Sequence, residues 1–157
     1  MTTNRYPWRS ARLGWVVAAL ALLVGGPLFL RMPLWCDVTL YDTAARSLLN
    51  GGVLYRDVFD TNPPGFPLLL AGVRGMCGFG WEVLRLVDLL VVGVITLLLV
   101  RWVKSAGGSV ASAAWLVAGV AAFYLFLSES CHVQRDVWML LPALIAARKG
   151  WMTEACV

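Results

Sequence analysis

The sequence predicts an all-α integral membrane protein, with about four hydrophobic helices and a partly helical first extracytoplasmic loop. Of its 157 residues, 60% are hydrophobic and only 14% are charged, a balance that is rare in water-soluble domains of this size. The mean hydropathy is +0.75. Uncharged runs recur along the chain, and the longest approach the ~20 residues that a helix needs to cross a bilayer core of ~30 Å.

The expected spans cover residues 13–30, 81–102, 109–127 and 133–147. Three arginines precede the first span, as in a signal peptide. Its apolar run is longer than the usual length of about 7–15 residues, however, and no small-x-small cleavage site follows, which favours a retained anchor. The fourth run is free of charge only over residues 137–147, too short a stretch to cross a bilayer unaided.

The distribution of basic residues predicts the orientation. If residues 1–12 form a cytoplasmic tail, the inner segments hold seven of the 13 Lys and Arg residues and the outer segments hold six. The three arginines of the tail decide between the two orientations. The sequence therefore predicts a multi-pass protein of the plasma (inner) membrane, with a transmembrane unit over residues 13–157 and an outer loop over residues 31–80. The formal net charge of +4 then reflects topology, and the expected partner is membrane lipid, with no nucleic acid.

The outer loop is predicted to have structure of its own. Apolar residues recur at helical spacing between Asp37 and Leu49, with a polar opposite face, which predicts a helix lying along the membrane surface. The Asn-Gly-Gly run at 50–52 ends this helix. The Thr-Asn-Pro-Pro-Gly run at 61–65 restricts the backbone, because the residue before a proline is pushed out of the α region. Residues 65–80 predict a short re-entrant or interfacial helix.

Side-chain patterns in the third and fourth spans predict their surroundings. Ala114, Ala118 and Ala122 recur every four residues with Gly119 beside them, and small residues at this spacing let helices approach closely. Trp138 falls at the predicted outer boundary of the fourth span, where indole rings favour the membrane–water interface. We therefore expect the third helix to pack inside a bundle and Trp138 to lie at its edge.

Three charged residues open the second span. Glu82, Arg85 and Asp88 are spaced by three residues, so they are neighbours along one helix. We interpret them as a structural ion cluster at the outer end of this span. The alternative is that Asp88 faces a cavity, because ionisable side chains inside membrane segments mark functional sites.

Two polar clusters are predicted to lie on the same side of the membrane. The first contains the loop acids Asp37, Asp42, Asp57 and Asp60, and the second is the segment 128–136 between the third and fourth spans. Their co-localisation is the main indication of a site in the residues themselves. The alternative is that outer loops are polar simply because they are hydrated.

Asp37 is the strongest candidate for chemistry in the outer loop. It lies a few residues beyond the first span, between apolar neighbours that include Trp35, Val38 and Leu40. A carboxylate in an apolar setting is suited to act as a base. The structural alternative is a helix N-cap, since Asp37 opens the predicted loop helix.

His132, Arg135 and Asp136 lie at the mouth of the fourth helix. Arginine and histidine are suitable partners for a phosphate, and a carboxylate can hold the arginine in place. The alternative is a solvated hairpin with one charge pair. His132 is the only histidine and no Cys-x-x-Cys motif exists, so the sequence gives little support to a zinc site.

The loop and the fourth helix carry a recognisable order of residues. A Gly-x-x-Tyr-x-Asp-x-x-Asp-x-Asn-Pro-Pro pattern comes first, and a Gln-Arg-Asp run that opens a proline-containing helix follows later; the matching residues are Gly52, Tyr55, Asp57, Asp60, Asn62, Pro63, Pro64, Gln134, Arg135, Asp136 and Pro142. This order resembles the start of the GT-C superfamily of multi-pass glycosyltransferases, in the group of the protein O-mannosyltransferases and the lipid A aminoarabinose transferases. The resemblance runs from about residue 13 to residue 149.

The resemblance implies an enzyme that transfers a sugar from a polyprenyl-phosphate carrier on the extracytoplasmic side. Asp37 would take the proton from the acceptor hydroxyl, and Asp136 would supply the second carboxylate that many relatives carry next to the first, where this chain has Val38. The implied substrate-binding residues are Tyr55, Arg56, Asp57, Asp60, Asn62, His132, Gln134 and Arg135. No cofactor is certain, and a divalent metal stays open.

Two other interpretations remain open at this stage. One is a non-catalytic multi-pass membrane protein, such as a piece of a lipid or oligosaccharide transporter or an assembly partner. The other is a short chain without a function of its own. Because GT-C enzymes are much longer, we expect this chain to be the N-terminal portion of a truncated or split protein, inactive alone and with the missing remainder as a partner.

Overall fold

A computed structural model of the chain describes residues 7–148. Within this range the structure is helical and has no β-strand, which confirms the predicted all-α class. The elements are α1 (Pro7–Arg31), α2 (Cys36–Leu49), α3 (Gly65–Cys77), α4 (Trp81–Ser105), α5 (Val110–Phe126), the 3₁₀ turn η1 (Glu129–Cys131) and α6 (Arg135–Arg148). The helix predicted over residues 37–49 is therefore present as α2.

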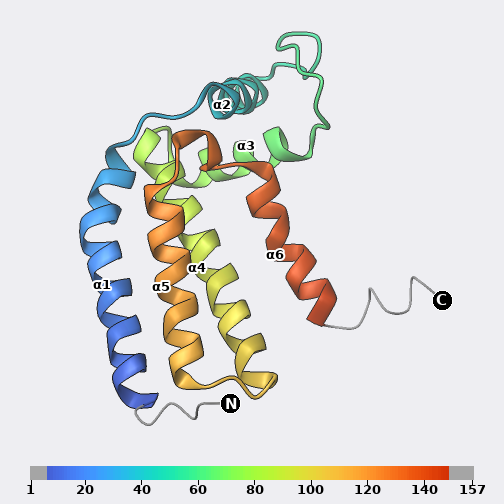
Figure 1. Cartoon of the computed structure of the whole chain (residues 1–157). Coiled ribbons are helices and arrows are strands. Elements are labelled where there is room, and N and C mark those ends of the chain that lie inside the picture. Colours follow the sequence, from blue (N-terminus) through green and yellow to red (C-terminus); the bar gives the residue numbers. More distant parts are fainter. Residues whose placement is uncertain (1–6, 149–157) are drawn as a thin grey trace, which may run out of the picture.

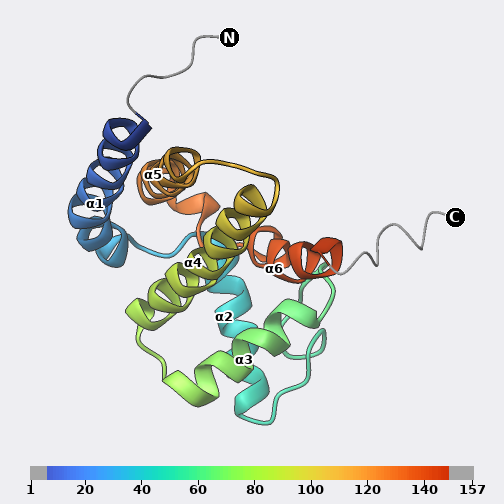
Figure 2. The same cartoon turned by 90° about the horizontal axis from the view of Figure 1, so that it is seen from below.

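Helices α1, α4 and α5 form the body of the molecule (Figure 1). Helices α1 and α5 run upward in this view and α4 runs downward, while α2 and α3 lie across the upper end. Helix α6 descends from the upper end beside α4 and stands apart from α1 in the view from below (Figure 2). The loop over 31–80 and the segment over 128–136 thus meet at the upper end of the bundle.

Within residues 7–148, two helices are long and apolar enough to cross a membrane. They cover Trp8–Arg31 and Trp81–Ser105, with 24 and 25 residues, or roughly 36–38 Å at ~1.5 Å per residue. Helix α5 has 17 residues and α6 has 14, so both are shorter than a typical span. A membrane protein is thus supported by helix length and composition, and the predicted number of four spans stays a prediction.

Small residues bring α1 and α5 into close contact. The buried face of α1 repeats at alternating intervals of three and four residues; it consists of Ala11, Gly14, Ala18, Ala21 and Gly25. A Cβ atom added to Gly14 would lie 2.9 Å from the Cβ of Ala114, and one added to Gly25 would lie 2.8 Å from the Cβ of Leu125. On α5, Ala118 is buried as predicted, whereas Ala122 is exposed. Close approach at the small residues explains why these helices pack side by side.

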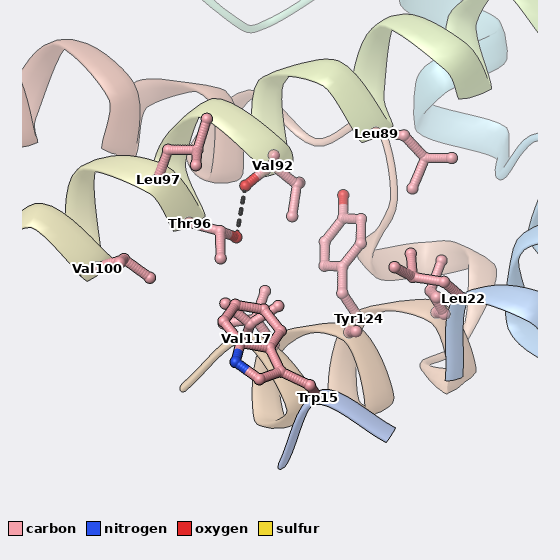
Figure 3. A pocket seen from close by; sticks show the side chains of 13 residues that line it. Trp15, Leu22, Leu89, Val92, Thr96, Leu97, Val100, Val117 and Tyr124 are labelled. Carbon is pink, nitrogen blue, oxygen red and sulfur yellow. Dashed lines mark hydrogen bonds between the residues drawn. The ribbon is translucent and has the colours of Figure 1, made fainter. Parts of the chain in front are cut away.

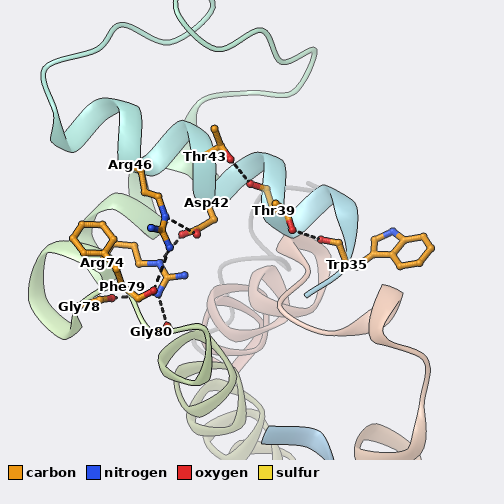
Figure 4. A network of polar contacts seen from close by, with 9 residues as sticks. All are labelled: Trp35, Thr39, Asp42, Thr43, Arg46, Arg74, Gly78, Phe79 and Gly80. Atoms are coloured by element: carbon orange, nitrogen blue, oxygen red, sulfur yellow. Dashed lines mark hydrogen bonds and ion pairs between the residues drawn. The ribbon is translucent and has the colours of Figure 1, made fainter. Parts of the chain in front are cut away.

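A buried carboxylate joins α2 to α3 at the upper end (Figure 4). Asp42 accepts hydrogen bonds from Arg74 Nε at 2.5 Å and from Arg46 Nε at 2.9 Å. The Arg74 side chain is fully buried, and its Nη1 donates to the carbonyl oxygens of Gly78 and Gly80 at 3.2 and 2.6 Å. This network fixes α2 on α3 and holds the turn that leads into α4.

The charged residues at the start of α4 are arranged differently from the prediction. Glu82 is exposed, whereas Arg85 and Asp88 are fully buried. Arg85 donates to the carbonyl oxygen of Pro33 and stacks over the Phe29 ring at 5.0 Å, and Asp88 binds other partners. The predicted cluster of three charged neighbours is therefore wrong, because the helix turns the last two residues into the bundle and leaves the first outside.

Candidate functional site

The candidate site is centred on Tyr41, in the middle of α2. The ring is buried and meets Phe66 of α3 edge-on at 5.2 Å between centroids, and Phe66 meets Trp138 of α6 at 5.4 Å. The Tyr41 hydroxyl forms no hydrogen bond with any residue between 7 and 148. The apolar side of the site is thus packed, and its phenol remains available to a ligand.

Charged groups from three segments act on the Tyr41 phenol. Burial is the main cause that raises its pKa, and the Arg135 guanidinium lowers the pKa in part. The carboxylates of Asp60, Asp37 and Asp136 raise it further. The same four charged side chains thus belong to one electrostatic neighbourhood at the upper end of the bundle. The fold thus assembles residues that are up to 99 positions apart in the sequence, from 37 to 136.

A chain of hydrogen bonds ties the loop to α6 at this site. Asp60 Oδ1 accepts from the backbone N and the side-chain Nδ2 of Asn62, at 2.9 and 2.8 Å. Asn62 Oδ1 accepts from Arg135 Nη1, and Arg135 also pairs with Asp136 at 3.4 Å. The Asp60 turn thereby positions the amide that holds the arginine. The two motifs that the sequence placed 73 residues apart are in direct contact.

Two polar atoms at this link have no partner among the described residues. They are Asp60 Oδ2 and Gln134 Nε2, and both are buried. One atom is a hydrogen-bond acceptor and the other is a donor. A buried polar atom without a partner costs free energy, so each of these two atoms is suited to a hydrogen bond with a ligand.

Asp37 lies at the edge of the site in the first turn of α2. Its side chain is exposed, and Trp35 occupies the N-cap position. Both expectations about its surroundings are corrected by these observations: Asp37 is not the N-cap, and its carboxylate faces solvent instead of apolar side chains. Its place one helical turn before Tyr41 follows from the i, i+4 spacing, which puts the two side chains on the same face.

Tyr55, Arg56 and Asp57 lie near the middle of the loop that joins α2 to α3, and we call this stretch the loop tip. Arg56 and Asp57 form an exposed ion pair at 2.8 Å, and Asp57 also accepts from the Val53 backbone N at 2.7 Å. The Arg56 hydrogen bond, followed by the Val53 bond, lowers the pKa of Asp57. These contacts fold the tip, and the bond from the Tyr55 hydroxyl to the carbonyl of Asn62 at 2.8 Å ties it to the site.

His132 is buried inside the bundle, away from the group around Tyr41. Its ring packs edge-on against Phe29 at 4.6 Å and against Tyr124 at 5.0 Å. The ring Nε2 lies 2.8 Å from the Tyr124 carbonyl oxygen; because a carbonyl only accepts, Nε2 carries the hydrogen. The predicted alternative of a solvated hairpin is therefore wrong for this residue.

Asp88 forms a second polar centre. The sequence indicated this only through the presence of a charged residue inside the second span. Its Oδ2 accepts from the Tyr124 hydroxyl at 2.8 Å and from the Val133 backbone N at 3.0 Å, and its Oδ1 accepts from Trp138 Nε1 at 2.7 Å. One carboxylate thereby joins α4, α5, α6 and the segment before α6. Trp138 is buried, so its indole ring packs inside the protein, and its predicted place at the membrane boundary stays a prediction.

The buried His132 predicts a loss of stability in acid. Burial is the main cause that lowers the pKa of its imidazole below the usual ~6.5. The unfolded chain then takes up the proton first as the pH falls, so the free energy of unfolding decreases below about pH 6.5. The variant His132→Gln keeps a donor for the Tyr124 carbonyl but does not titrate. We therefore expect its free energy of unfolding to depend less on pH in this acidic range. Unfolding in detergent across pH 5–8 measures it, and equal slopes in both proteins would contradict the assignment.

The described residues hold no group of three or more His, Cys, Asp or Glu side chains that is arranged to bind a metal ion. The acids near Tyr41 are instead paired with Arg135 or Asn62, or exposed. The chemistry that this arrangement offers is that of an exposed carboxylate beside a phenol and a guanidinium, which suits proton transfer next to an anion.

Comparison with known proteins identifies no relative of this chain. No protein-family model matches it, and no curated protein or solved structure matches it. Any function assigned to the Tyr41 group therefore rests on the residues and contacts of this chain alone.

Proposed function

We propose that the group around Tyr41 is the reaction site of a membrane glycosyltransferase that takes a sugar from a polyprenyl-phosphate carrier. The observation that supports this function is the direct contact between the loop and α6, in which Asn62 joins Asp60 to Arg135 and Arg135 pairs with Asp136. Asp37 lies on α2 at the same end of the bundle. A transferase of this kind needs a base for the acceptor and a cation for the phosphate leaving group. Both types of group are present at one place.

The proposal includes the topology of the chain. Helices α1 and α4 span the plasma (inner) membrane, and α5 crosses with them because it packs along α1. Residues 1–12 and the turn between α4 and α5 face the cytoplasm, as the basic residues favour. The upper end then faces the extracytoplasmic side, where the carrier presents its sugar.

The exposed carboxylate of Asp37 acts as the base in this mechanism. It accepts the proton of the acceptor hydroxyl while the hydroxyl oxygen bonds to the anomeric carbon of the sugar. The bond between that carbon and the carrier phosphate oxygen breaks at the same time, and its electron pair leaves with the phosphate. The configuration at the anomeric carbon is inverted, and the position of Asp37 in the first turn of α2 keeps its side chain accessible.

Arg135 stabilises the negative charge that develops on the leaving phosphate. Its guanidinium is held by Asn62 and Asp136, and it keeps further N–H groups for a ligand. The unpartnered oxygen of Asp60 and the unpartnered amide of Gln134 suit a sugar hydroxyl, which donates to the first and accepts from the second. The sugar and the phosphate would thus be bound by neighbouring residues of one link.

Substitution of Asp37 tests the chemical step. We expect Asp37→Asn to lower turnover by about 10²–10⁴-fold, the usual contribution of a positioned base, with binding of the lipid-linked sugar retained. The assay follows sugar transfer from a panel of polyprenyl-phosphate donors in native membranes, where the chain is accompanied by the remainder of the protein that it is expected to need. Glu82→Gln is the matched control, because Glu82 is an exposed acid at the same end and contacts no site residue. Unchanged turnover in Asp37→Asn would remove Asp37 as the base.

The same assay separates catalysis from binding. If wild-type membranes bind the lipid-linked sugar but transfer nothing with any donor, a non-catalytic carrier or assembly protein replaces the transferase. Arg135→Gln should then weaken binding, because its guanidinium would still hold the phosphate. If the membranes neither bind nor transfer the lipid-linked sugar, the group around Tyr41 does not bind polyprenyl-phosphate sugars, and the proposal is overturned.

A further inference from the structure

Two cavities on one side of the molecule meet at Trp15. The first has a volume of about 380 Å³ and lies between α1, α4 and α5 (Figure 3). The second, of about 480 Å³, lies between the lower ends of α1 and α5 and is lined by Trp8, Arg12 and Ser109 among others. Trp15 lines both cavities, so the two lie next to each other along α1, one beside the middle of the bundle and the other at its lower end.

The upper cavity offers a ligand only hydrocarbon contacts. Leu22, Leu89, Leu97, Val117 and Val120 are among the residues that line it. Its two side-chain hydroxyl groups already donate elsewhere, that of Thr96 to the Val92 carbonyl at 2.7 Å and that of Tyr124 to Asp88 at 2.8 Å. An occupant of this cavity therefore needs no polar groups, which suits an alkyl chain.

Basic side chains lie beside the lower cavity, whose walls are otherwise mostly apolar. The guanidinium groups of Arg12 and Arg9 both lie 5.2 Å from the centre of the Trp8 ring. Helices α1 and α5 contain no acidic residue, and α4 ends nearby with Arg101 and Lys104. Clusters of basic and indole side chains are typical of the level at which a helix meets lipid headgroups. The basic side chains beside the lower cavity therefore favour an occupant with an anionic group at this end.

We propose that the two cavities bind one anionic phospholipid, with an acyl chain between α1, α4 and α5 and its phosphate at Arg12. Charge complementarity and the adjacency of the two cavities at Trp15 select this occupant, because it combines an anionic head with an apolar tail. The inference rests on the membrane topology proposed above, in which this end faces the cytoplasmic leaflet. It is independent of the sugar-transfer chemistry, since the site lies at the opposite end of the bundle from Tyr41.

Two glycines offer a matched pair of variants for the tail. A Cβ atom added to Gly93 or to Gly119 would meet no atom within 4 Å, so a larger side chain is tolerated by the fold at both positions. Gly93 lines the upper cavity and Gly119 does not. The variant Gly93→Leu therefore places a side chain where the acyl chain would lie, whereas the side chain of Gly119→Leu lies outside the upper cavity.

The test uses the full chain, extracted from membranes into a mild detergent and delipidated. Native mass spectrometry measures binding of added phosphatidylglycerol and phosphatidylcholine. We expect the wild-type protein and Gly119→Leu to bind one phosphatidylglycerol in preference to phosphatidylcholine, and Gly93→Leu to lose it. Arg12→Gln should reduce the preference about fivefold, the usual effect of one basic residue near an anionic headgroup. Arg31→Gln, an exposed arginine at the opposite end of α1, should not.

Several results would overturn the proposal. Equal retention by the two leucine variants would exclude the cavity as the tail site, and equal affinity for both lipids would exclude the headgroup site. A shift from dimer to monomer in Gly93→Leu would make the cavity a contact between two copies of the chain. Extraction of the wild-type chain by alkaline carbonate would remove the membrane topology itself, whereas a carbonate-resistant chain that binds no lipid would remove only this site.

Discussion

Replacement of Asp88 with leucine is expected to destabilise the protein strongly. The change leaves three donors without an acceptor: the Tyr124 hydroxyl, the Val133 backbone N and Trp138 Nε1. Each buried donor that loses its partner costs about 1–3 kcal/mol. The free energy of unfolding, measured by denaturant titration in detergent micelles, should fall accordingly. Glu82→Leu on the same helix is the control, because Glu82 is exposed.

Backbone strain adds to the effect at Asp88. Val133 has a φ of 56°, a conformation that is unfavourable for a β-branched residue and costs about 1–3 kcal/mol. The hydrogen bond from its backbone N to Asp88 at 3.0 Å helps to hold this conformation. Without that bond the segment between α5 and α6 is free to relax, and the start of α6 should lose protection from hydrogen exchange first.

A double-mutant cycle checks that the donors cause the loss. Tyr124→Phe removes one of them, so the cost of Asp88→Leu should be smaller in the Tyr124→Phe background than in the wild type. Strictly additive free energies would show that Asp88 acts without the Tyr124 hydroxyl. Retention of wild-type stability in Asp88→Leu would contradict the role of this carboxylate altogether.

Removal of the Asp42 carboxylate is expected to have the second large effect. Asp42→Ala leaves the fully buried guanidinium of Arg74 without its counter-ion, and breaking a buried ion pair from one side usually costs about 3–5 kcal/mol. The loss should concentrate where the network acts, in α2 and in the turn over residues 78–80 (Figure 4). Hydrogen exchange and the free energy of unfolding measure the local and the global effect.

Two comparisons make this prediction specific. Asp57→Ala removes a carboxylate from an exposed pair at the loop tip and should change stability far less, since solvent screens that pair. The double variant Asp42→Leu with Arg74→Met should regain much of the loss, because no unpaired charge is then buried. If the double variant is as unstable as Asp42→Ala, the buried charge is not the cause.

Much of the local structure follows from the sequence. The apolar runs, the helical spacing of residues 37–49 and the Asn-Gly-Gly stop at 50–52 predict where helices begin and end, and α2 appears at Cys36–Leu49. Such features depend on neighbours within one or two turns, which the sequence lists directly. The four-residue spacing of Ala114 and Ala118 likewise predicts that they lie in a close contact between helices, and both are buried in the structure, Ala114 against Gly14 of α1.

The sequence predicted which residues belong to the candidate site, but it did not predict which of them contact one another. Co-localisation of the loop with the segment 128–136 follows from topology alone, because two connections at the same end of a bundle must lie together. The separation of His132 from that group could not be read from its charge or spacing. Tyr41 had one sequence signal, its place four residues after Asp37, and its importance depends on partners from the loop and α6.

The sequence by itself determined that this protein is built from apolar helices, that one end of it is polar, and where each helix lies along the chain. Only the tertiary structure decided that Asp88 faces Tyr124 and Trp138, and that Asn62 meets Arg135. The physical reason is the range of the forces involved. Helix formation is governed by contacts within a turn, whereas the partner of a buried polar group depends on the rotation and packing of whole helices, which no local pattern encodes.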